Sequence, residues 1–573
     1  MTHMRGKAAI TLVVAALALL SYPLAAQAPI TYERLLNAAK EPHNWLTYGG
    51  DYFSNRHSPL TQITPANVKS LNLAWAHQSP LTGSWQATPI VADGIMYLTQ
   101  RPNDVLALDA ATGRVFWVYR YTNDPTLVVC CGSNNRGLAI LGETVFMGTL
   151  DAHLIALDAR SGRPIWKTRV DDSKAGYSIT VSPLVVKDKV VIGVGGGEYG
   201  IRGFIAAYDA ATGKEAWRFY TIPGPGEPGH ETWEPCPPNT KTLCDPEAWK
   251  HGGGSIWVTG SFDPALNLTY WGVGNAGPDY AHEQRPGDNL YAASVVALDA
   301  DSGKLRWHYQ FTPHDPYDYD SVQVPVLADI TFDGKPLKAM LWANRNGLFY
   351  VLDRVTGKFL LGKPFVRVNW MNGFDANGRP IPTPQPPGMP TYPAIQGGTN
   401  WYSPSYSPRT RLMYISAWED QAQLYGWSPI EYQEGRNFTG GVNQPFVPMP
   451  NEPTKAIPGA PAIQGLIRGP INNWTDAAGH GAIMAIDPAT GTAKWKFNMT
   501  DVTDAGIVTT ATDLLITGGR EGYLKILDAR TGTLLWKATV GAQVRQNPIT
   551  YAVNGKQYVA AIAGLTLFVF ALP

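Results

Sequence analysis

Apolar and polar residues alternate in short runs along most of the chain, which is the period expected of strands with one buried face. The clearest runs end in Asp, followed four residues later by Gly and then, after a further four residues, by Trp. In each case the Asp closes an alternating strand, the Gly permits the positive φ of a tight turn, and the Trp lies on the returning strand. The pattern predicts repeated β-hairpins and no long surface helices.

Six copies of this hairpin are complete, at 105–117, 154–166, 205–217, 295–307, 483–495 and 524–536. A seventh copy, at 350–361, carries Leu361 where the others have Trp. Another strand precedes each hairpin, so each unit supplies about four strands, and a Trp at a constant place suggests a wedge between neighbouring sheets. Sheets of this kind repeated along a chain are typical of a β-propeller.

We therefore predict an all-β, eight-bladed β-propeller that occupies 29–573 as a single domain with loop insertions. A degenerate unit around 405–418 is added to the seven copies as the eighth blade. The C-terminal strands near 558–572 are expected to complete the ring beside an N-terminal strand near Trp75. The uneven spacing of the copies places long Pro-rich insertions near 221–250, 372–398 and 428–470, and such loops usually build a site on one face.

The N-terminus predicts export. Arg5 and Lys7 precede an apolar run at 8–20 that is too short to span a bilayer, and Ala26-Gln27-Ala28 matches a cleavage site. We expect residues 1–28 to be a signal peptide and the mature protein to be periplasmic, with no membrane span. The 46 basic and 46 acidic residues leave no net charge for a polyanion, so nucleic acid is not an expected partner.

Four cysteines in an exported chain are candidates for disulfides. Cys130 and Cys131 are neighbours, and they could form a ring across one peptide bond, remain thiols, or bridge to the other pair. Cys236 and Cys244 lie in a Pro-rich insertion and are interpreted as a loop staple. No CxxCH motif is present in the sequence, so covalently attached haem of the c type is not expected.

Gly-rich stretches and carboxylates supply the candidate chemistry. The stretches 195–198 and 252–257 let backbone approach a flat ligand, and Trp257 offers an aromatic face. In an extended segment Asp318 and Asp320 point to the same side, which favours a hard cation, with a solvated acidic turn as the alternative. His314 lacks a zinc-like partner set and is interpreted as a structural residue.

The sequence resembles the pyrroloquinoline quinone (PQQ) dependent alcohol dehydrogenases over nearly the whole mature chain. The resemblance begins with WLTYGGDYFSNRHSPLTQI (45–63) and continues through Cys130-Cys131, GGGEYGIRG (195–203), GGGSIW (252–257), GVGNAGP (272–278), RPGDN (285–289), TPHDPYDY (312–319) and ANRNGLFYVLDR (343–354). It implies a periplasmic eight-bladed propeller that binds PQQ and a metal ion.

By this resemblance PQQ would lie between a Cys130–Cys131 ring and the Trp257 indole, with further contacts from Gln86, Arg136, Thr180, Gly196, Gly197, Ser255, Arg345, Asn400 and Trp401. The family's metal ligands match Glu198, Asn275 and Asp318, and Asp318 also matches the catalytic base. The additional Asp320 resembles the lanthanide-dependent branch. Three carboxylates suit a trivalent ion, so a lanthanide is the first choice and Ca²⁺ the alternative.

The implied reaction is oxidation of a primary alcohol to an aldehyde, with hydride passing to PQQ and the alcohol proton to Asp318. Electrons would leave to a separate cytochrome c, and a homodimer is left open. Departures from the family are Gln86 in place of Glu, Asp504 where a Trp is familiar, and a C-terminal end at 563–573 without the Gly-Trp loop. The alternatives are a quinoprotein acting on sugars or polyols, and a non-catalytic scaffold propeller.

Overall fold

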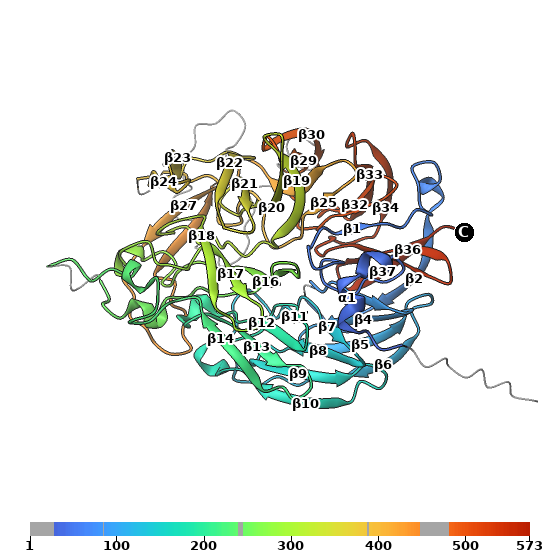
Figure 1. Ribbon diagram of the computed structural model, residues 1–573, viewed down its shortest axis with the longest axis horizontal. Helices are drawn as coiled ribbons and strands as arrows, with labels where there is room; N and C mark the ends of the chain where they lie inside the picture. Colours follow the sequence, from blue (N-terminus) through green and yellow to red (C-terminus); the bar gives the residue numbers. More distant parts are fainter. Residues whose placement is uncertain (1–27, 84, 239–243, 387–388, 447–480) are drawn as a thin grey trace, which may run out of the picture.

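The computed structural model describes residues 28–83, 85–238, 244–386, 389–446 and 481–573, so all but the last residue of the predicted signal peptide lies outside the described residues. The described strands form a ring of eight sheets around a central axis (Figure 1). Seven sheets have four strands and one has five, because β1 adds to it in parallel. The eight-bladed propeller is confirmed.

The first four blades follow one another along the chain, each with its first strand nearest the axis (Figure 1). Their strands are β3 (Ile90–Ala92), β4 (Ile95–Gln100), β5 (Asp104–Asp109) and β6 (Val115–Tyr119); β7 (Ala139–Leu141), β8 (Thr144–Gly148), β9 (His153–Asp158) and β10 (Pro164–Arg169); β11 (Leu184–Val186), β12 (Lys189–Gly193), β13 (Phe204–Asp209) and β14 (Glu215–Tyr220); and β15 (Ser261–Asp263), β16 (Leu268–Gly272), β17 (Ser294–Asp299) and β18 (Leu305–Gln310).

The other four blades include the strands that close the ring. Their strands are β19 (Val326–Phe332), β20 (Lys335–Ala343), β21 (Leu348–Asp353) and β22 (Phe359–Pro364); β25 (Ser405–Ser407), β26 (Leu412–Trp418), β29 (Gly481–Asp487) and β30 (Thr492–Met499); β31 (Val508–Thr510), β32 (Leu514–Gly518), β33 (Tyr523–Asp528) and β34 (Leu534–Thr539) with β1 (His57–Ser58); and β35 (Ile549–Val553), β36 (Lys556–Ala563) and β37 (Thr566–Ala571) with β2 (Asn72–Gln78).

Two additional hairpins lie outside the blades, β23 (Met371–Phe374) with β24 (Pro380–Pro382), and β27 (Ala422–Trp427) with β28 (Gly441–Phe446). Helices are short, and in the described ranges none has the length and apolarity needed to cross a membrane. They are α1 (Tyr32–Leu36) and the 3₁₀ turns η1 (Ala38–Lys40), η2 (Val68–Ser70), η3 (Ser173–Ala175), η4 (Gly197–Tyr199), η5 (His230–Thr232), η6 (Ala248–His251) and η7 (His282–Gln284).

Each of the seven sequence copies forms the outer two strands of a blade, but the assignment of the eighth blade from the sequence is wrong. The degenerate unit at 405–418 forms β25 and β26, which are the inner strands of the blade whose outer hairpin is the copy at 483–495. The insertion after β26 separates the two halves of this blade in the sequence. The eighth blade is the C-terminal one.

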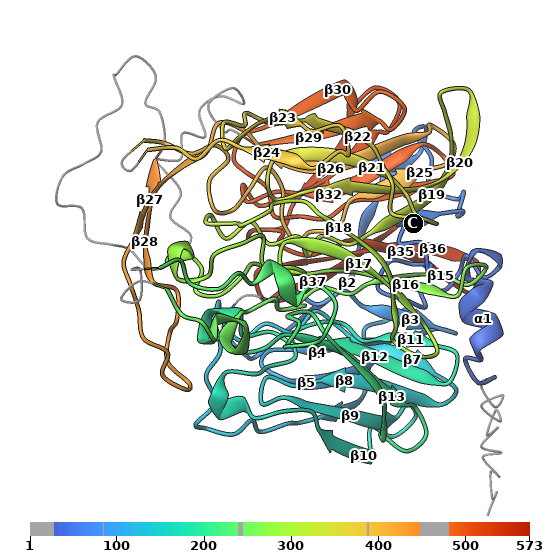
Figure 2. The same cartoon turned by 60° about the vertical axis from the view of Figure 1, so that its left-hand side comes forward.

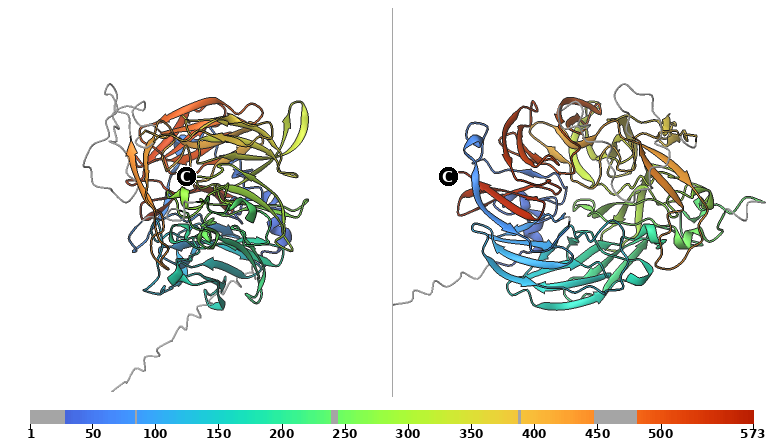
Figure 3. Two further views of the ribbon diagram at one scale, coloured as in Figure 1. Left: turned by 90° about the vertical axis from the view of Figure 1, so that its left-hand side faces the viewer. Right: turned by 180° about the vertical axis from the view of Figure 1, so that it is seen from behind.

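The ring closes as predicted, through the N-terminal strand that contains Trp75. Strand β2 pairs antiparallel with β37, so the two ends of the chain share one sheet (Figures 1 and 3). Because β2 is the outermost strand of that sheet, separating the last blade from its neighbours also requires breaking the β2–β37 pairing. The closure therefore ties the first described segment to the last.

The repeated Trp and Gly belong to one interblade contact. A Cβ atom on Gly213 would lie 2.6 Å from Cε3 of Trp166 in the preceding blade, so the indole packs directly on the turn. The Trp166 Nε1 atom donates a hydrogen bond to the Ala210 carbonyl in the same turn, at 3.1 Å. Equivalent indole–glycine contacts join Trp75 to Gly113, Trp117 to Gly162, Trp217 to Gly303, Trp307 to Gly357 and Trp495 to Gly532. Leu361 makes the contact with Gly491 in the copy that lacks Trp.

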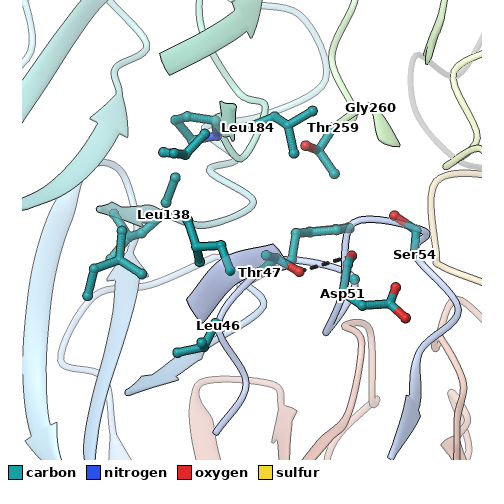
Figure 4. Close-up of a pocket in the computed structure, with 15 residues that line it drawn as sticks. Leu46, Thr47, Asp51, Ser54, Leu138, Leu184, Thr259 and Gly260 are labelled. Atoms are coloured by element: carbon teal, nitrogen blue, oxygen red, sulfur yellow. Dashed lines mark hydrogen bonds between the residues drawn. The ribbon is translucent and has the colours of Figure 1, made fainter. Parts of the chain in front are cut away.

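The segment 45–58 crosses the inner ends of the blades. Its carbonyl groups accept hydrogen bonds from β15, β19, β25 and β31, and the buried Arg56 donates to the carbonyls of Tyr48, Ile507 and Pro548. A cavity of about 20 Å³, room for one water molecule, lies between this segment and the inner strands (Figure 4). The segment therefore fills the ring near its axis.

The insertions gather on one side of the ring. The β27–β28 hairpin lies on the opposite side of the molecule from α1 (Figure 2). The carbonyl of Thr439, in the connection between β27 and β28, accepts a hydrogen bond from the Tyr280 N–H group. The Cys236–Cys244 disulfide closes a loop in the 221–250 insertion, which confirms the staple predicted from the sequence. Only part of the insertion at 428–470 falls in the described residues.

We expect Gly213→Ala to lower the free energy of unfolding by about 2 to 5 kcal/mol, because the added methyl group would overlap the Trp166 indole at a φ of 70°. Gly334→Ala is the control, since this glycine has a φ of 74° and no atom within 4 Å of the added Cβ. Gly334→Ala should lower the free energy of unfolding by only about 1 to 2 kcal/mol. Urea unfolding measures both, and equal losses would contradict a role for the indole contact.

Candidate cofactor and metal site

The predicted site residues all belong to two kinds of connection, although they are far apart in the sequence. Connections between successive blades carry Gln86, Cys130, Cys131, Arg136, Thr180, Ser255, Trp257, Asp318, Asp320, Asn400 and Trp401, and connections between the second and third strands of a blade carry Gly196, Gly197, Glu198, Asn275 and Arg345. Because successive strands run antiparallel, both kinds of connection leave the sheets at the same face. The fold thus gathers them at one end of the ring.

Cys130 and Cys131 form a disulfide between neighbouring residues, which settles the alternatives left open by the sequence. The Cys131 Sγ atom lies 3.8 Å from Oε1 of Glu198. Cys131 belongs to the connection between β6 and β7, and Glu198 to the connection between β12 and β13. Glu198 sits in η4, whose first residue is Gly197. A Cβ atom on Gly197 would lie 3.4 Å from Oγ of Ser255 and 3.7 Å from Oδ1 of Asn275, so alanine would fit there in ordinary contact but would fill the space that glycine leaves.

Arg136 is the buried cation on the disulfide side of the site. Its Nη1 atom donates to Oγ1 of Thr180 at 3.0 Å and to the Trp257 carbonyl at 3.1 Å, and its guanidinium carbon lies 4.6 Å from the Trp257 ring. Burial lowers its pKa to about 10, and its buried Nε atom has no hydrogen-bond partner in the part of the chain that the structure describes. A buried donor of this kind suits an anionic group such as a carboxylate of PQQ.

The carboxylates are organised by Arg345 and by a close backbone approach. Arg345 forms ion pairs with Asp320 and, at 3.3 Å, with Asp318. The Asn275 N–H group donates to Oδ1 of Asp320 at 3.0 Å. A Cβ atom on Gly274 would lie 2.5 Å from that same oxygen, so the loop after β16 can reach Asp320 only because this residue is glycine.

Electrostatics identify the region as one that favours a cation. Burial, followed by the charge of Asp320, raises the pKa of Glu198 to about 7. Burial raises the pKa of Asp318 well above its ordinary value; Arg345 opposes this shift, while Asp320, Asp279 and Glu198 add to it. Buried carboxylates that repel one another are the donor set that a hard cation stabilises. In the described residues the oxygens of Glu198, Asp318 and Asp320 do not all lie within 4.8 Å of one another.

Arg285 links the loop after β16, which carries Asn275, to the loop after β18, which carries Asp318 and Asp320. This fully buried arginine donates to the Pro278 carbonyl in the first loop and to the Asp315 carbonyl in the second. His314 contacts the Gly287 carbonyl through Nδ1 and His282 through Nε2, at 2.7 and 2.9 Å. His314 thus has the structural role expected from the sequence.

Some predicted residues are placed at this face without a described contact to the rest. Gln86 is buried with Oε1 unpartnered, and Oδ1 of Asn400 accepts from the Trp401 N–H group. Trp401 does join the cluster, because its ring lies 5.4 Å from the Arg136 guanidinium carbon. Asp504, the departure from the family noted above, is buried in ion pairs with Arg520 and Arg545.

Sequence reasoning missed Asp279, which is buried among the same charges. It follows Asn275 by four residues and has no acidic neighbour in the sequence, so no local cluster drew attention to it. The only available signal was a carboxylate directly after the GVGNAGP motif.

The fold defines an eight-bladed propeller with buried charged side chains at one end of the ring, and comparisons with known proteins show its family. The model of the PQQ glucose/ethanol/alcohol dehydrogenase β-propeller domain matches residues 45–368 and 370–559. Quinohemoprotein alcohol dehydrogenase ADH IIB from Pseudomonas putida is 38% identical over 95% of this chain and 77% of its own length. Quinoprotein alcohol dehydrogenase PedH, also from Pseudomonas putida, is 35% identical over 97% of this chain and 91% of its own length.

A solved europium-containing methanol dehydrogenase superposes with a TM-score of 0.83 at 32% identity, covering 94% of this chain and all of the other. The chain belongs to the family of PQQ-dependent alcohol dehydrogenases. These relatives do not favour the scaffold or sugar alternatives, because they are named as alcohol dehydrogenases.

We expect the neutral histidine pair to make the fold acid-sensitive. Burial lowers the pKa of His282 to about 3 and of His314 to about 4, so their contribution to stability is complete above the ordinary value of 6.5 and declines as the pH falls toward 4. For each ring that stays neutral in the folded state, the free energy of unfolding falls by about 1.4 kcal/mol for each pH unit of acidification in this window. His282→Gln should therefore lose less thermal stability than the wild type between pH 7 and pH 4.5. Identical losses of thermal stability in the two proteins would contradict the conclusion that both histidine rings are neutral in the folded state.

Proposed function

We propose that this chain is a periplasmic quinoprotein that oxidises primary alcohols to aldehydes with PQQ and a lanthanide ion, passing electrons to a cytochrome c. The observation that carries the proposal is the set of buried, mutually repelling carboxylates beside the Cys130–Cys131 disulfide, in a member of this dehydrogenase family. We also propose that residues 1–28 are a signal peptide and that 29–573 form one PQQ-binding propeller domain.

The residues around the disulfide fit the cofactor. The unpartnered Nε of Arg136, the unpartnered Oε1 of Gln86 and the open space at Gly197 offer polar contacts and room for a flat group. In this proposal Trp257 and the disulfide flank PQQ, while its carboxylates and carbonyls meet the polar set Arg136, Thr180, Ser255, Arg345 and Asn400, with Gln86, Gly196, Gly197 and Trp401 beside them. The sulfur atoms and the indole supply stacking surfaces that also exclude water.

The metal would be held by Glu198, Asn275, Asp318 and Asp320. When bound, PQQ supplies a two-electron acceptor, and the cation supplies a Lewis acid that offsets the repulsion between the carboxylates. Asp318 would accept the hydroxyl proton of the alcohol, and a carboxylate desolvated to this degree is a stronger base than one in water. Arg345 holds Asp318 and Asp320 by ion pairs, so it orients the base.

The lanthanide is preferred over Ca²⁺ because Asp320 adds a third carboxylate to Glu198 and Asp318. Ligand charge and number discriminate between hard cations. The resemblance in fold to a europium-containing enzyme supports this preference. A cytochrome c acceptor is supported by a 38% identical relative from Thauera butanivorans, named 1-butanol dehydrogenase (cytochrome c).

Protein reconstituted with PQQ and La³⁺ should reduce an artificial electron acceptor when a primary alcohol is added. Asp318→Asn should lower kcat by about 10²- to 10⁴-fold while PQQ remains bound, because the amide cannot accept the alcohol proton. Asp333→Asn makes the same chemical change on an exposed turn and should leave kcat unaltered. Full activity in Asp318→Asn would exclude it as the base, and no alcohol-dependent turnover with either metal in the wild type would reject the function.

Asp320→Ala tests the choice of metal. We expect it to abolish most of the La³⁺-supported rate and to spare the Ca²⁺-supported rate, since the remaining carboxylates suit a divalent ion. Steady-state rates with each metal, measured on the same protein preparations, give the comparison. Equal La³⁺-supported turnover before and after the substitution would rule out the lanthanide assignment.

A further inference from the structure

Asp279 is a buried carboxylate that has no part in the site as described so far. The residue is 2% exposed, and its Oδ1 atom has no hydrogen-bond partner among the described residues. A buried carboxylate oxygen without a partner is costly, so a group of this kind calls for an explanation. It belongs to the same connection, between β16 and β17, that carries Asn275.

The surroundings of Asp279 are those of the proposed metal site. Burial, and after it the charge of Glu198, raises the pKa of Asp279 well above its ordinary value; the Asn275 side chain lowers it and the charge of Asp320 raises it further. Asp279 is also one of the charges that raise the pKa of Asp318. The carboxylate is therefore within electrostatic reach of all three carboxylates proposed as ligands, and it lies four residues from Asn275 in the same connection.

The position of Asp279 is held by backbone contacts that do not neutralise its carboxylate. Arg285 donates from Nη2 to the Asp279 carbonyl at 3.1 Å and to the Asp315 carbonyl at 2.6 Å. The Tyr280 N–H group donates to the Thr439 carbonyl, which anchors the next residue to the segment before β28. These contacts fix the main chain and leave one side-chain oxygen available.

The balance of charge changes when Asp279 is counted. Glu198, Asp318 and Asp320 face Arg345, which leaves two uncompensated negative charges if all three are ionised. Arg136 does not enter this balance, because in the proposed function it meets a carboxylate of PQQ. An ionised Asp279 raises the number of uncompensated negative charges to three, which matches the three positive charges of a lanthanide ion. Arg285 does not alter the comparison, because it also faces the buried Asp315.

We propose that Asp279 turns its unpartnered Oδ1 atom toward the cation and supplies the fourth carboxylate of the metal site. The Asn275 Nδ2 atom donates to the Ala276 carbonyl at 3.3 Å, and this bond orients the amide as supporting hydrogen bonds orient ligands in metal sites. This inference rests on the proposed function, which places a cation beside Glu198 and Asp318. It explains how the site gains affinity for a trivalent ion beyond the contribution of Asp320.

The test is Eu³⁺ binding to the whole chain, reconstituted with PQQ and freed of metal. Asp279→Asn keeps the size of the side chain and removes its charge, and it should weaken Eu³⁺ binding by about 10- to 100-fold. Ca²⁺ affinity should fall less, because the attraction between ions scales with the charge of the cation. Asp279→Ala removes the oxygen as well as the charge, so its Eu³⁺ luminescence lifetimes in H₂O and D₂O should reveal an additional bound water.

Glu283→Gln is the matched control, because it removes the same charge from an exposed position four residues along the chain. It should leave Eu³⁺ affinity and the number of bound waters unaltered. An unaltered affinity in Asp279→Asn, or an unaltered number of bound waters in Asp279→Ala, overturns the proposal. A wild type that binds Ca²⁺ as tightly as Eu³⁺ would instead reject the lanthanide assignment, and weaker Ca²⁺ binding by Asp279→Asn would then still support Asp279 as a ligand.

A direct measurement avoids dependence on the stability of any variant. Crystals of the wild-type protein with PQQ and Eu³⁺ would locate the ion by anomalous scattering. An Asp279 oxygen within about 2.6 Å of the ion, the usual range for oxygen ligands of hard cations, supports the proposal. An ion held by Glu198 and Asp318 with Asp279 outside that range overturns it and leaves the proposed function intact.

Discussion

The contact between an indole on one blade and a glycine turn on the next is the interaction on which the ring depends. Trp166 cannot bury its ring within its own sheet, and the Gly213 turn accepts it only because no Cβ atom is present. Each such contact fixes the angle between two sheets, and repetition around the axis brings the last sheet back to β2. Leu361 preserves the apolar part of the contact on Gly491 and omits the hydrogen bond that an indole would donate.

Closure of the ring determines where the chemistry can occur. Antiparallel strands place every connection between blades on the face that also receives the turns after each second strand. Glu198, Asp318 and Asp279 are brought together there, although each comes from a different connection. Their repulsion opposes folding of the metal-free protein, and Arg345 balances only part of it. A cation bound among these carboxylates would offset their repulsion.

The local pattern of the sequence was a good guide to the hairpins, and a poorer guide to how they combine. The copies ending in Trp formed outer strands as expected, and Cys130–Cys131 paired. The unit at 405–418 was assigned to a separate blade because a long insertion hides its partner strand β29. The resemblance to a family indicated most of the site, but not Asp279, because no pattern in its neighbourhood distinguishes a buried carboxylate from an exposed one.

The sequence by itself determined the strand period, the turn glycines, the docking Trp residues and the family. These features depend on residues a few positions apart, where side-chain alternation and backbone sterics act directly. Only the tertiary structure decided that β26 pairs with β29 and that Arg345 holds Asp320. It also decided that Asp279 is buried with one oxygen that no other described residue hydrogen-bonds. Such contacts join distant segments, and their geometry and desolvation exist only once the closed ring has packed those segments together.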